Sequence, residues 1–208
     1  MNHRDASQLA SGLRLALEPG CKRIEIAGSV RREKPDPHDL ELVAIPRIEE
    51  RDARDLFNMQ VGTHKVNLFE IRLIELLDEC EWEFDPVLKR NGPHYKRLRH
   101  VRTEICADVF LTTFAGWGGA LAMRTGPADF SQGLVTLALR QRKHVADGYL
   151  IHGHMKPESR CPKGSSCSLI IPTLTEEAFF QALGLPWCEP KDRTAEWLWA
   201  EAKRKVMA

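Results

Sequence analysis

A short strand-like run with two acids on one side most limits what this chain can fold into. The run is DLELVAIP, in which a single leucine separates Asp39 from Glu41. Successive side chains of a β-strand point to opposite faces, so the two carboxylates point the same way. The pattern therefore predicts a strand over 39–45 that presents an acid pair on one face.

A glycine-serine pair, Gly28-Ser29, follows the alternating run RIEIA and begins eleven residues before Asp39. Glycine lets the backbone approach a ligand closely, and a helix that begins there offers free N–H groups to phosphate. Ser29 adds a hydroxyl donor, and Arg32 lies on the same helix face with a fork suited to phosphate. Alone the pair is more typical of a turn. At this spacing from the acid pair, it indicates a nucleotidyltransferase.

A third acid, Asp108, stands in the apolar run ICADVFL. An acid among strand-forming apolar residues is costly to bury without a metal ion or a partner. Two divalent ions roughly 3.5–4 Å apart can activate an attacking oxygen and stabilise leaving pyrophosphate, and Mg²⁺ prefers a few carboxylates plus waters and phosphate oxygens. We expect Asp39, Glu41 and Asp108 to bind two Mg²⁺ (or Mn²⁺) ions. For Asp108 taken alone, a solvent-facing strand residue is the alternative.

The pattern of apolar residues predicts an α+β chain in two parts. Residues 1–114 are expected to form a mixed sheet with flanking helices, and 115–208 a smaller α/β unit, because the composition changes to Thr, Gly and Trp near 112–119. Predicted helices span 5–18, 28–33, 49–57, 68–77, 117–123, 128–143, 175–183 and 194–206. Predicted strands span 22–27, 39–45, 81–85, 94–101, 104–111, 148–151 and 168–171. The first helix is expected to bury Leu9, Leu13, Leu15 and Leu17.

Charge is balanced overall and uneven locally. The 208 residues carry a net charge of +1, yet residues 88–102 contain six Lys or Arg, two His and no acid. Such a stripe can follow a phosphate backbone, or it can be a solvated strand face. No apolar run approaches the roughly 18 residues of a membrane helix, and the first residues lack the core of a secretory signal. Six cysteines without regular spacing suggest reduced thiols and a cytoplasmic location.

The loop before the last predicted strand contains four residues of metal-binding type. His152, His154, Cys161 and Cys167 could together bind zinc. Five residues separate the two cysteines, however, which is longer than the usual two to four. An exposed loop or a disulfide-capable cysteine pair is therefore the favoured alternative.

The segment 28–41 resembles the family X DNA polymerases, the group of DNA polymerase beta. Their motif is Gly-Ser, an arginine pair, a short loop and Asp-x-Asp, and the spacing here matches without a gap. The triplets RTG at 124–126 and DFS at 129–131 resemble the family's thumb segment that packs on the incoming nucleotide. The runs LGLPW at 183–187 and EPKDR at 189–193 resemble the end of the thumb. The resemblance covers about 10–193, and the chain is similar to the small phage, viral and bacterial members of the family.

The resemblance implies a nucleotidyltransferase palm followed by a thumb, without the family's amino-terminal lyase and helix-hairpin-helix regions. It also implies transfer of a dNMP to a primer 3′-hydroxyl, with release of pyrophosphate. The implied nucleotide-binding residues are Gly28, Ser29, Arg32, Thr125 and Gly126. The implied metal-binding and catalytic residues are Asp39, Glu41 and Asp108, and the last helps to deprotonate the hydroxyl.

DNA, gapped or as primer-template, is the expected macromolecular partner of a monomeric protein in a bacterial or phage-infected cell. The expected DNA-binding residues are Lys89, Arg90, Lys96, Arg97, Arg99 and Arg102. About half of them should face away, because strand side chains alternate.

Two departures from the family pattern keep other functions open. Glu41 stands where the polymerases usually have Asp, and Met123-Arg124 replaces an aromatic pair before the thumb Thr-Gly. A gap-filling repair polymerase is the leading hypothesis, favoured by the basic stripe and the thumb-like second half. The alternatives are a nucleotidyltransferase acting on untemplated DNA or RNA ends, a small molecule or a protein, and a DNA-binding module without catalysis.

Overall fold

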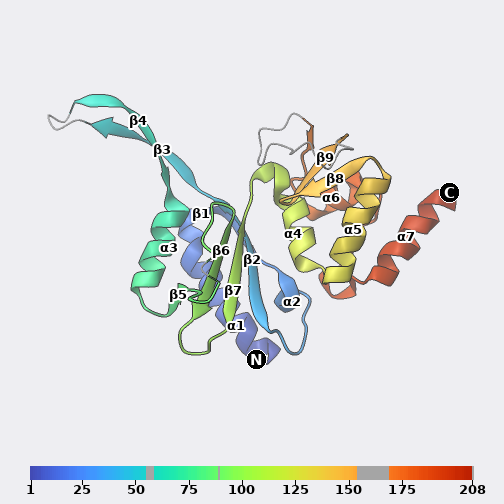
Figure 1. Ribbon diagram of the computed structural model, residues 1–208, viewed down its shortest axis with the longest axis horizontal. Coiled ribbons are helices and arrows are strands. Elements are labelled where there is room, and N and C mark those ends of the chain that lie inside the picture. Colours follow the sequence, from blue (N-terminus) through green and yellow to red (C-terminus); the bar gives the residue numbers. More distant parts are fainter. Residues whose placement is uncertain (55–58, 89, 154–168, 208) are drawn as a thin grey trace.

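The computed structural model describes residues 1–54, 59–88, 90–153 and 169–207 and has two lobes (Figure 1). The larger lobe is built on a five-stranded sheet, and the smaller one packs helices against a three-stranded sheet. A two-stranded hairpin projects from the larger lobe. The predicted α+β class, with a mixed sheet and flanking helices, is confirmed. Within the described residues, no helix has the length and apolar character needed to cross a membrane.

Most predicted elements are present, with ends shifted by a few residues. The helices are α1 (His3–Leu17), α2 (Gly28–Arg31), α3 (Leu68–Asp78), α4 (Trp117–Thr125), α5 (Ala128–Arg140), α6 (Glu176–Ala182) and α7 (Ala195–Met207), with short 3-10 turns η1 (Glu18–Gly20), η2 (Phe114–Gly116) and η3 (Pro190–Asp192). The strands are β1 (Cys21–Ile26), β2 (Asp39–Pro46), β3 (Ile48–Arg54), β4 (Gln60–Asn67), β5 (Trp82–Phe84), β6 (Tyr95–His100), β7 (Cys106–Leu111), β8 (Lys143–Ala146), β9 (Tyr149–His152) and β10 (Ile170–Ile171).

The main sheet has the order β1-β2-β7-β6-β5, and β2 and β7 at its centre are parallel. The neighbouring pairs in this sheet are antiparallel. Leu40 and Leu42 of β2 and Ala107 and Val109 of β7 are fully buried in a core that α1 and α3 cover. The intervening positions face the other side of the sheet, where the acids lie. Alternation in these two strands therefore sets both the core and the site.

Helix α1 begins at an Asn2 cap whose side chain accepts a hydrogen bond from the Asp5 N–H. The apolar face of α1 is narrower than predicted. Leu13 and Leu17 are buried, but Leu15 is 56% exposed. A residue two positions from each of them lies on the far side of a helix with 3.6 residues per turn. The expectation that Leu15 faces inward was therefore wrong.

The prediction of a helix over 49–57 was also wrong. Residues Ile48–Arg54 form β3, which pairs antiparallel with β4, and Arg51 lies opposite His64. A polar segment without apolar periodicity does not distinguish a helix from a strand, so the partner strand decides. Likewise, α5 ends at Arg140, and 143–146 pairs with β9 as β8 instead of extending the helix.

The smaller lobe has its own apolar core. Phe130 of α5, Phe179 and Phe180 of α6 and Leu198 of α7 are fully buried together. A separate cluster joins the two lobes, in which Val43 and Ile45 of β2 and Ala27 pack against residues of α4, among them the buried Trp117. The two lobes are therefore packed against each other at this cluster. The division at 114/115 stays a prediction.

Candidate active site

The three acids predicted to act together lie on one face of the main sheet. In the parallel pairing of β2 with β7, Glu41 is directly opposite Asp108. Asp39 lies two residues before Glu41, opposite Cys106. All three acids are partly buried, while their neighbours Leu40 and Ala107 are fully buried on the opposite face. The register thus brings together acids that are distant in the sequence.

These carboxylates affect one another electrostatically. Burial, and next the charge of Asp39, raise the pKa of Glu41 to about 7, against an opposing effect of Arg124. Burial and the charge of Asp108 also raise the pKa of Asp39. Like charges that share a site each disfavour ionisation of the others, and a bound cation would reverse this effect. The donor chemistry of the three acids therefore suits a hard divalent cation.

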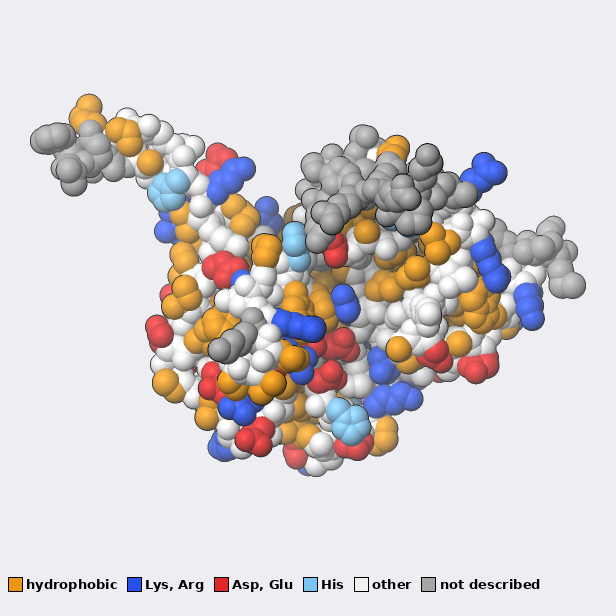
Figure 2. All heavy atoms as spheres, in the orientation of Figure 1, with side chains coloured by type: hydrophobic (Ala, Val, Ile, Leu, Met, Phe, Trp, Pro, Cys, Tyr) orange, Lys and Arg blue, Asp and Glu red, His pale blue; other side chains and the backbone are white. Residues whose placement is uncertain are grey.

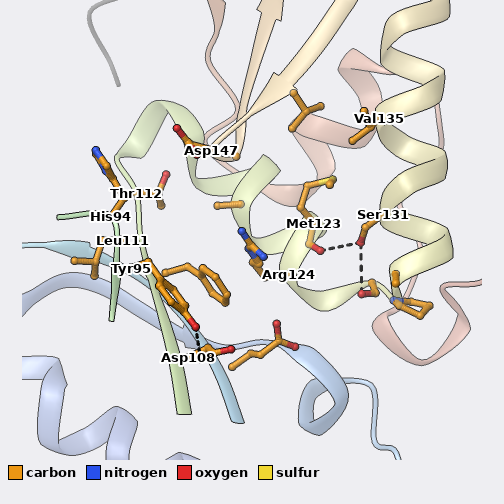
Figure 3. Close-up of a pocket in the computed structure, with 18 of the residues that line it drawn as sticks. His94, Tyr95, Asp108, Leu111, Thr112, Met123, Arg124, Ser131, Val135 and Asp147 are labelled. Carbon is orange, nitrogen blue, oxygen red and sulfur yellow. Dashed lines mark hydrogen bonds between the residues drawn. The ribbon is translucent and has the colours of Figure 1, made fainter. Parts of the chain in front are cut away.

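The carboxylate of Asp108 is nevertheless held by groups from β6. Arg97 donates from Nη1 to both oxygens of Asp108, at 2.8 Å and 3.0 Å. The Tyr95 hydroxyl donates to Oδ1 of Asp108 at 2.6 Å (Figure 3). Arg97 lies directly opposite Asp108 in the antiparallel pairing of β6 with β7. Among the described residues, no three His, Cys, Asp or Glu side chains converge as a group ready to hold a metal ion.

The Gly28-Ser29 turn packs directly on Glu41. Gly28 has a φ of +63°, and a Cβ at this position would lie 2.1 Å from Oε2 of Glu41, so only glycine fits. The backbone N–H of Ala27 donates to the carbonyl of Glu41 at 2.7 Å, which fixes the turn to β2. Sequence spacing predicted this proximity. The structure adds that the turn and the acid are in contact.

Two polar atoms at this turn are buried without a hydrogen-bond partner in the described part of the chain, Oγ of Ser29 and Nε of Arg32. Burial lowers the pKa of the Arg32 guanidinium, although the charges of Glu41 and Asp39 oppose that shift. Buried polar groups in native proteins are nearly always hydrogen-bonded, so unpaired ones require an explanation. An anionic ligand that accepts from both groups would satisfy them.

Thr125 and Gly126, expected at the nucleotide, join the site to α2. The Thr125 side chain is fully buried, and its hydroxyl accepts from Nη1 of Arg31 at 2.8 Å. The carbonyl of Thr125 accepts from Nη1 of Arg32. The Thr125 hydroxyl is therefore occupied by Arg31, whereas Gly126 lines the pocket described next.

A pocket of about 740 Å³ opens between the two lobes, above the acids. Figure 2 shows acidic and basic side chains gathered in the hollow between the lobes. Glu41 and Asp108 line the pocket together with Phe110 of β7 and Arg124 of α4. Asp108 lies at the lower end of the view in Figure 3. The Arg124 guanidinium lies 3.7 Å from the Phe110 ring centroid, a close cation–π contact. Sequence reasoning did not assign Phe110 a role. Its place on the acid-bearing face of β7, two residues after Asp108, was the available signal.

Two residues of the predicted DNA-binding stripe are bound within the larger lobe. The Lys96 side chain is 5% exposed, and its ammonium pairs with Glu70 at 2.7 Å. Arg99 donates from Nε to Oε1 of Glu83 at 2.8 Å. Side chains of β6 alternate between the core side and the acid-bearing side of the sheet. Lys96 and Arg99, three positions apart, therefore lie on opposite sides.

The remaining residues of the stripe have different surroundings. Arg90 lines the pocket, and Arg102 is exposed in the turn between β6 and β7. Arg97 binds Asp108 instead of facing open solvent. Lys89 lies outside the described residues.

The candidate zinc loop is not covered by the structure. His152 ends β9 and is exposed. His154, Cys161 and Cys167 lie outside the described residues, so zinc binding stays a prediction.

The fold is similar to that of known proteins. Residues 120–194 match the family model described as DNA polymerase beta thumb. Among solved structures, the crystal structure of Leishmania infantum polymerase beta in a ternary gap complex is similar with a TM-score of 0.66 and 16% sequence identity, covering 93% of this chain and 70% of that one. None of the curated proteins compared matches the chain. The chain therefore has the fold of polymerase beta, and its residues 120–194 are similar to the thumb domain of DNA polymerase beta.

Proposed function

We propose that this protein is a DNA-directed DNA polymerase that adds a dNMP to a primer 3′-hydroxyl and fills short gaps during repair. The observation that carries the proposal is the register of β2 against β7, which sets Glu41 opposite Asp108 with Asp39 on the same face. Beside these acids are the Gly28 turn and a pocket of about 740 Å³, within the roughly 300–1,000 Å³ typical of ligand sites.

The acids would hold two Mg²⁺ or Mn²⁺ ions, which when bound activate an attacking oxygen and neutralise phosphate charge. In this proposal Asp108, on the central strand β7, accepts the proton of the primer 3′-hydroxyl. Asp39 and Glu41 complete the carboxylate set from β2.

Binding of the triphosphate is assigned to the turn before β2. Gly28 lets the backbone come close to the ligand, the Ser29 hydroxyl is buried without a partner in the described structure, and Arg32 supplies a positive charge with its Nε unpaired. Hydrogen bonds from charged donors to phosphate are among the stronger ones in proteins. Gly28 lies against the Glu41 side chain, and the charge of Glu41 acts on Arg32, so the proposed phosphate-binding turn adjoins the proposed metal site.

Gapped DNA is the proposed substrate for two reasons. The polymerase beta structure that this fold resembles is a ternary gap complex. In addition, Arg90 brings a positive charge from the predicted stripe to the pocket. A thumb of the polymerase beta type supports a templated reaction over transfer to a small molecule.

A primer-extension assay tests this proposal. Gapped DNA, blunt DNA, single-stranded DNA and RNA are each offered with dNTPs, in Mg²⁺ and in Mn²⁺. We expect extension of gapped DNA, and a loss of at least roughly 100-fold in Asp39→Asn and Asp108→Asn, since even residues that only support a metal ligand change activity by 10–100-fold. Asp36→Asn, at an exposed acid outside the pocket, is the matched control. Full activity in Asp108→Asn would remove that residue from the mechanism.

A second candidate function is transfer to an untemplated acceptor. Arg124, laid on Phe110, stands in the pocket where the polymerase resemblance implies an aromatic side chain. In the same assay, extension of single-stranded or blunt ends in preference to gapped DNA would favour this candidate. Failure of every acceptor while DNA still binds would favour a non-catalytic binding module.

A further inference from the structure

Arg97 is held between two carboxylates, those of Asp85 and Asp108. Its Nε donates to Oδ2 of Asp85 at 2.8 Å, and its Nη1 donates to both oxygens of Asp108. Burial lowers the pKa of Arg97, but its hydrogen bonds with Asp85 and Tyr95 and the charge of Asp108 outweigh this and raise the pKa overall. Arg97 is therefore a fixed positive charge at the carboxylate site.

Asp85 anchors this arginine to the backbone. It is 5% exposed, and its Oδ1 accepts from the N–H groups of Val87 at 2.8 Å and Leu88 at 3.2 Å. Those bonds fix the Asp85 carboxylate and leave Oδ2 for Arg97. A guanidinium held through Nε by an immobile partner keeps its Nη1 directed at Asp108, because its donors form a rigid fork.

Asp108 is consequently turned toward β6. Its Oδ1 accepts from both Arg97 and the Tyr95 hydroxyl, and its Oδ2 accepts from Arg97. Tyr95 is itself positioned by Phe110, with ring centroids 5.1 Å apart. These contacts explain why the three acids share a face without forming a group ready for a metal ion in the described structure.

We propose that Arg97 is a built-in counter-cation that holds Asp108 in the metal-free protein and competes with the divalent ion for it. A metal ion that enters among the acids has to share Asp108 with a charge that is already in place, or displace it. Arg97 is thus a positioning residue that weakens metal binding by the nucleotide-free protein. This inference rests on the proposed metal site at Asp39, Glu41 and Asp108.

The test is Mn²⁺ binding to the nucleotide-free protein, followed through the electron paramagnetic resonance signal of free Mn²⁺. Arg97→Gln removes the charge and keeps a planar donor group. We expect this variant to bind Mn²⁺ about tenfold more tightly than the wild type, within the usual 5–150-fold range of coupling between two bound groups. Arg99→Gln is the matched control on the same strand, since Arg99 pairs with Glu83, and its Mn²⁺ affinity should equal that of the wild type.

A second variant covers the case in which Arg97→Gln does not fold, as judged by thermal unfolding. Tyr95→Phe removes one hydrogen bond to Asp108 without changing charge, and we expect two- to threefold tighter Mn²⁺ binding, corresponding to about 0.5 kcal/mol. Adding Asp39→Asn to either variant should abolish the gain. Equal or weaker binding in Arg97→Gln, or in Tyr95→Phe if only that variant folds, overturns the inference. Primer extension by the wild type tests the proposed function separately. If the wild type extends primers but the variants bind Mn²⁺ as the wild type does, the role of Arg97 is refuted and the proposed function stands.

Discussion

Arg31 of α2 and Glu176 of α6 form a two-pronged ion pair between the lobes, with N–O distances of 2.9 Å and 2.6 Å. Oε1 of Glu176 also accepts from Nη1 of Arg193 at 2.8 Å. The side chain of Arg193 is fully buried, and that of Glu176 is 4% exposed. Burial raises the pKa of Glu176, but the hydrogen bonds from the two arginines outweigh it and lower the pKa overall.

Glu176→Gln should destabilise the protein by about 3–5 kcal/mol, because it leaves the buried charge of Arg193 without a counter-charge. Urea denaturation followed by tryptophan fluorescence measures this change. Glu177→Gln is the control, since Glu177 is an exposed neighbour on the same helix. A loss below about 1 kcal/mol in Glu176→Gln would mean that the buried Arg193 does not depend on Glu176 for its counter-charge.

Gly28→Ala should lower both stability and nucleotide binding. Alanine at a φ of +63° is strained by about 1–2 kcal/mol, and its Cβ would meet the Glu41 carboxylate at 2.1 Å. Gly12→Ala should instead stabilise the protein, because Gly12 lies inside α1 with nothing within 4 Å of an added Cβ. That control should gain about 0.5–1 kcal/mol. Thermal unfolding of the two variants checks the contrast, and equal behaviour would contradict it.

Without divalent metal, the contribution of Glu41 to stability should fall as the pH rises from about 4.5 to about 7. The folded-state pKa of Glu41, about 7, lies above its usual 4.5, so the folded chain binds this proton more tightly than the unfolded chain. The contribution of Glu41 to the free energy of unfolding is complete below pH 4.5 and is lost by about pH 7. It amounts to about 3 kcal/mol at most. Urea denaturation in a chelator at pH 5 and pH 8.5 measures it. Glu41→Gln should show a smaller decline, and an unchanged decline would assign the effect to other groups.

Binding of DNA should depend on Arg90 more than on Arg99. Each phosphate contact that is lost reduces the slope of log affinity against log salt by about 1. Arg90 lines the pocket, whereas Arg99 is paired with Glu83. Fluorescence anisotropy with gapped DNA over a salt series should therefore show a shallower slope for Arg90→Ala and an unchanged slope for Arg99→Ala. The reverse order would place the DNA over the β5–β6 side of the sheet.

The site was predictable from sequence as far as strand alternation reaches. The two-residue spacing of Asp39 and Glu41 predicts their common face, and an acid in an apolar run makes Asp108 the candidate for a third member, which the register places opposite Glu41. The partner of Arg97 was not predictable, because it depends on the register of β6 against β7, which no local pattern encodes. The same holds for Arg31 and Glu176, which are 145 residues apart in sequence.

Individual elements were predicted wrongly where the local sequence does not favour one conformation over another. The segment 48–54 has no apolar periodicity, and pairing with β4 makes it a strand. Leu15 was placed inward because it is apolar, although its position on α1 faces solvent. Pairing with β4 decided the first case, and the 3.6-residue period of the helix decided the second.

The ion pairs of Glu176 have a mechanical consequence. A hinge rotation that widened the entrance for substrate would separate Arg31 from Glu176 and expose the apolar cluster around Trp117. Separating Arg31 from Glu176 would leave a nearly buried carboxylate with one counter-charge, that of Arg193, in place of two, and this loss opposes the rotation. Exposed side chains of the entrance, above all Arg124, can rearrange far more cheaply. Substrate entry should thus begin with swinging side chains rather than with parting lobes.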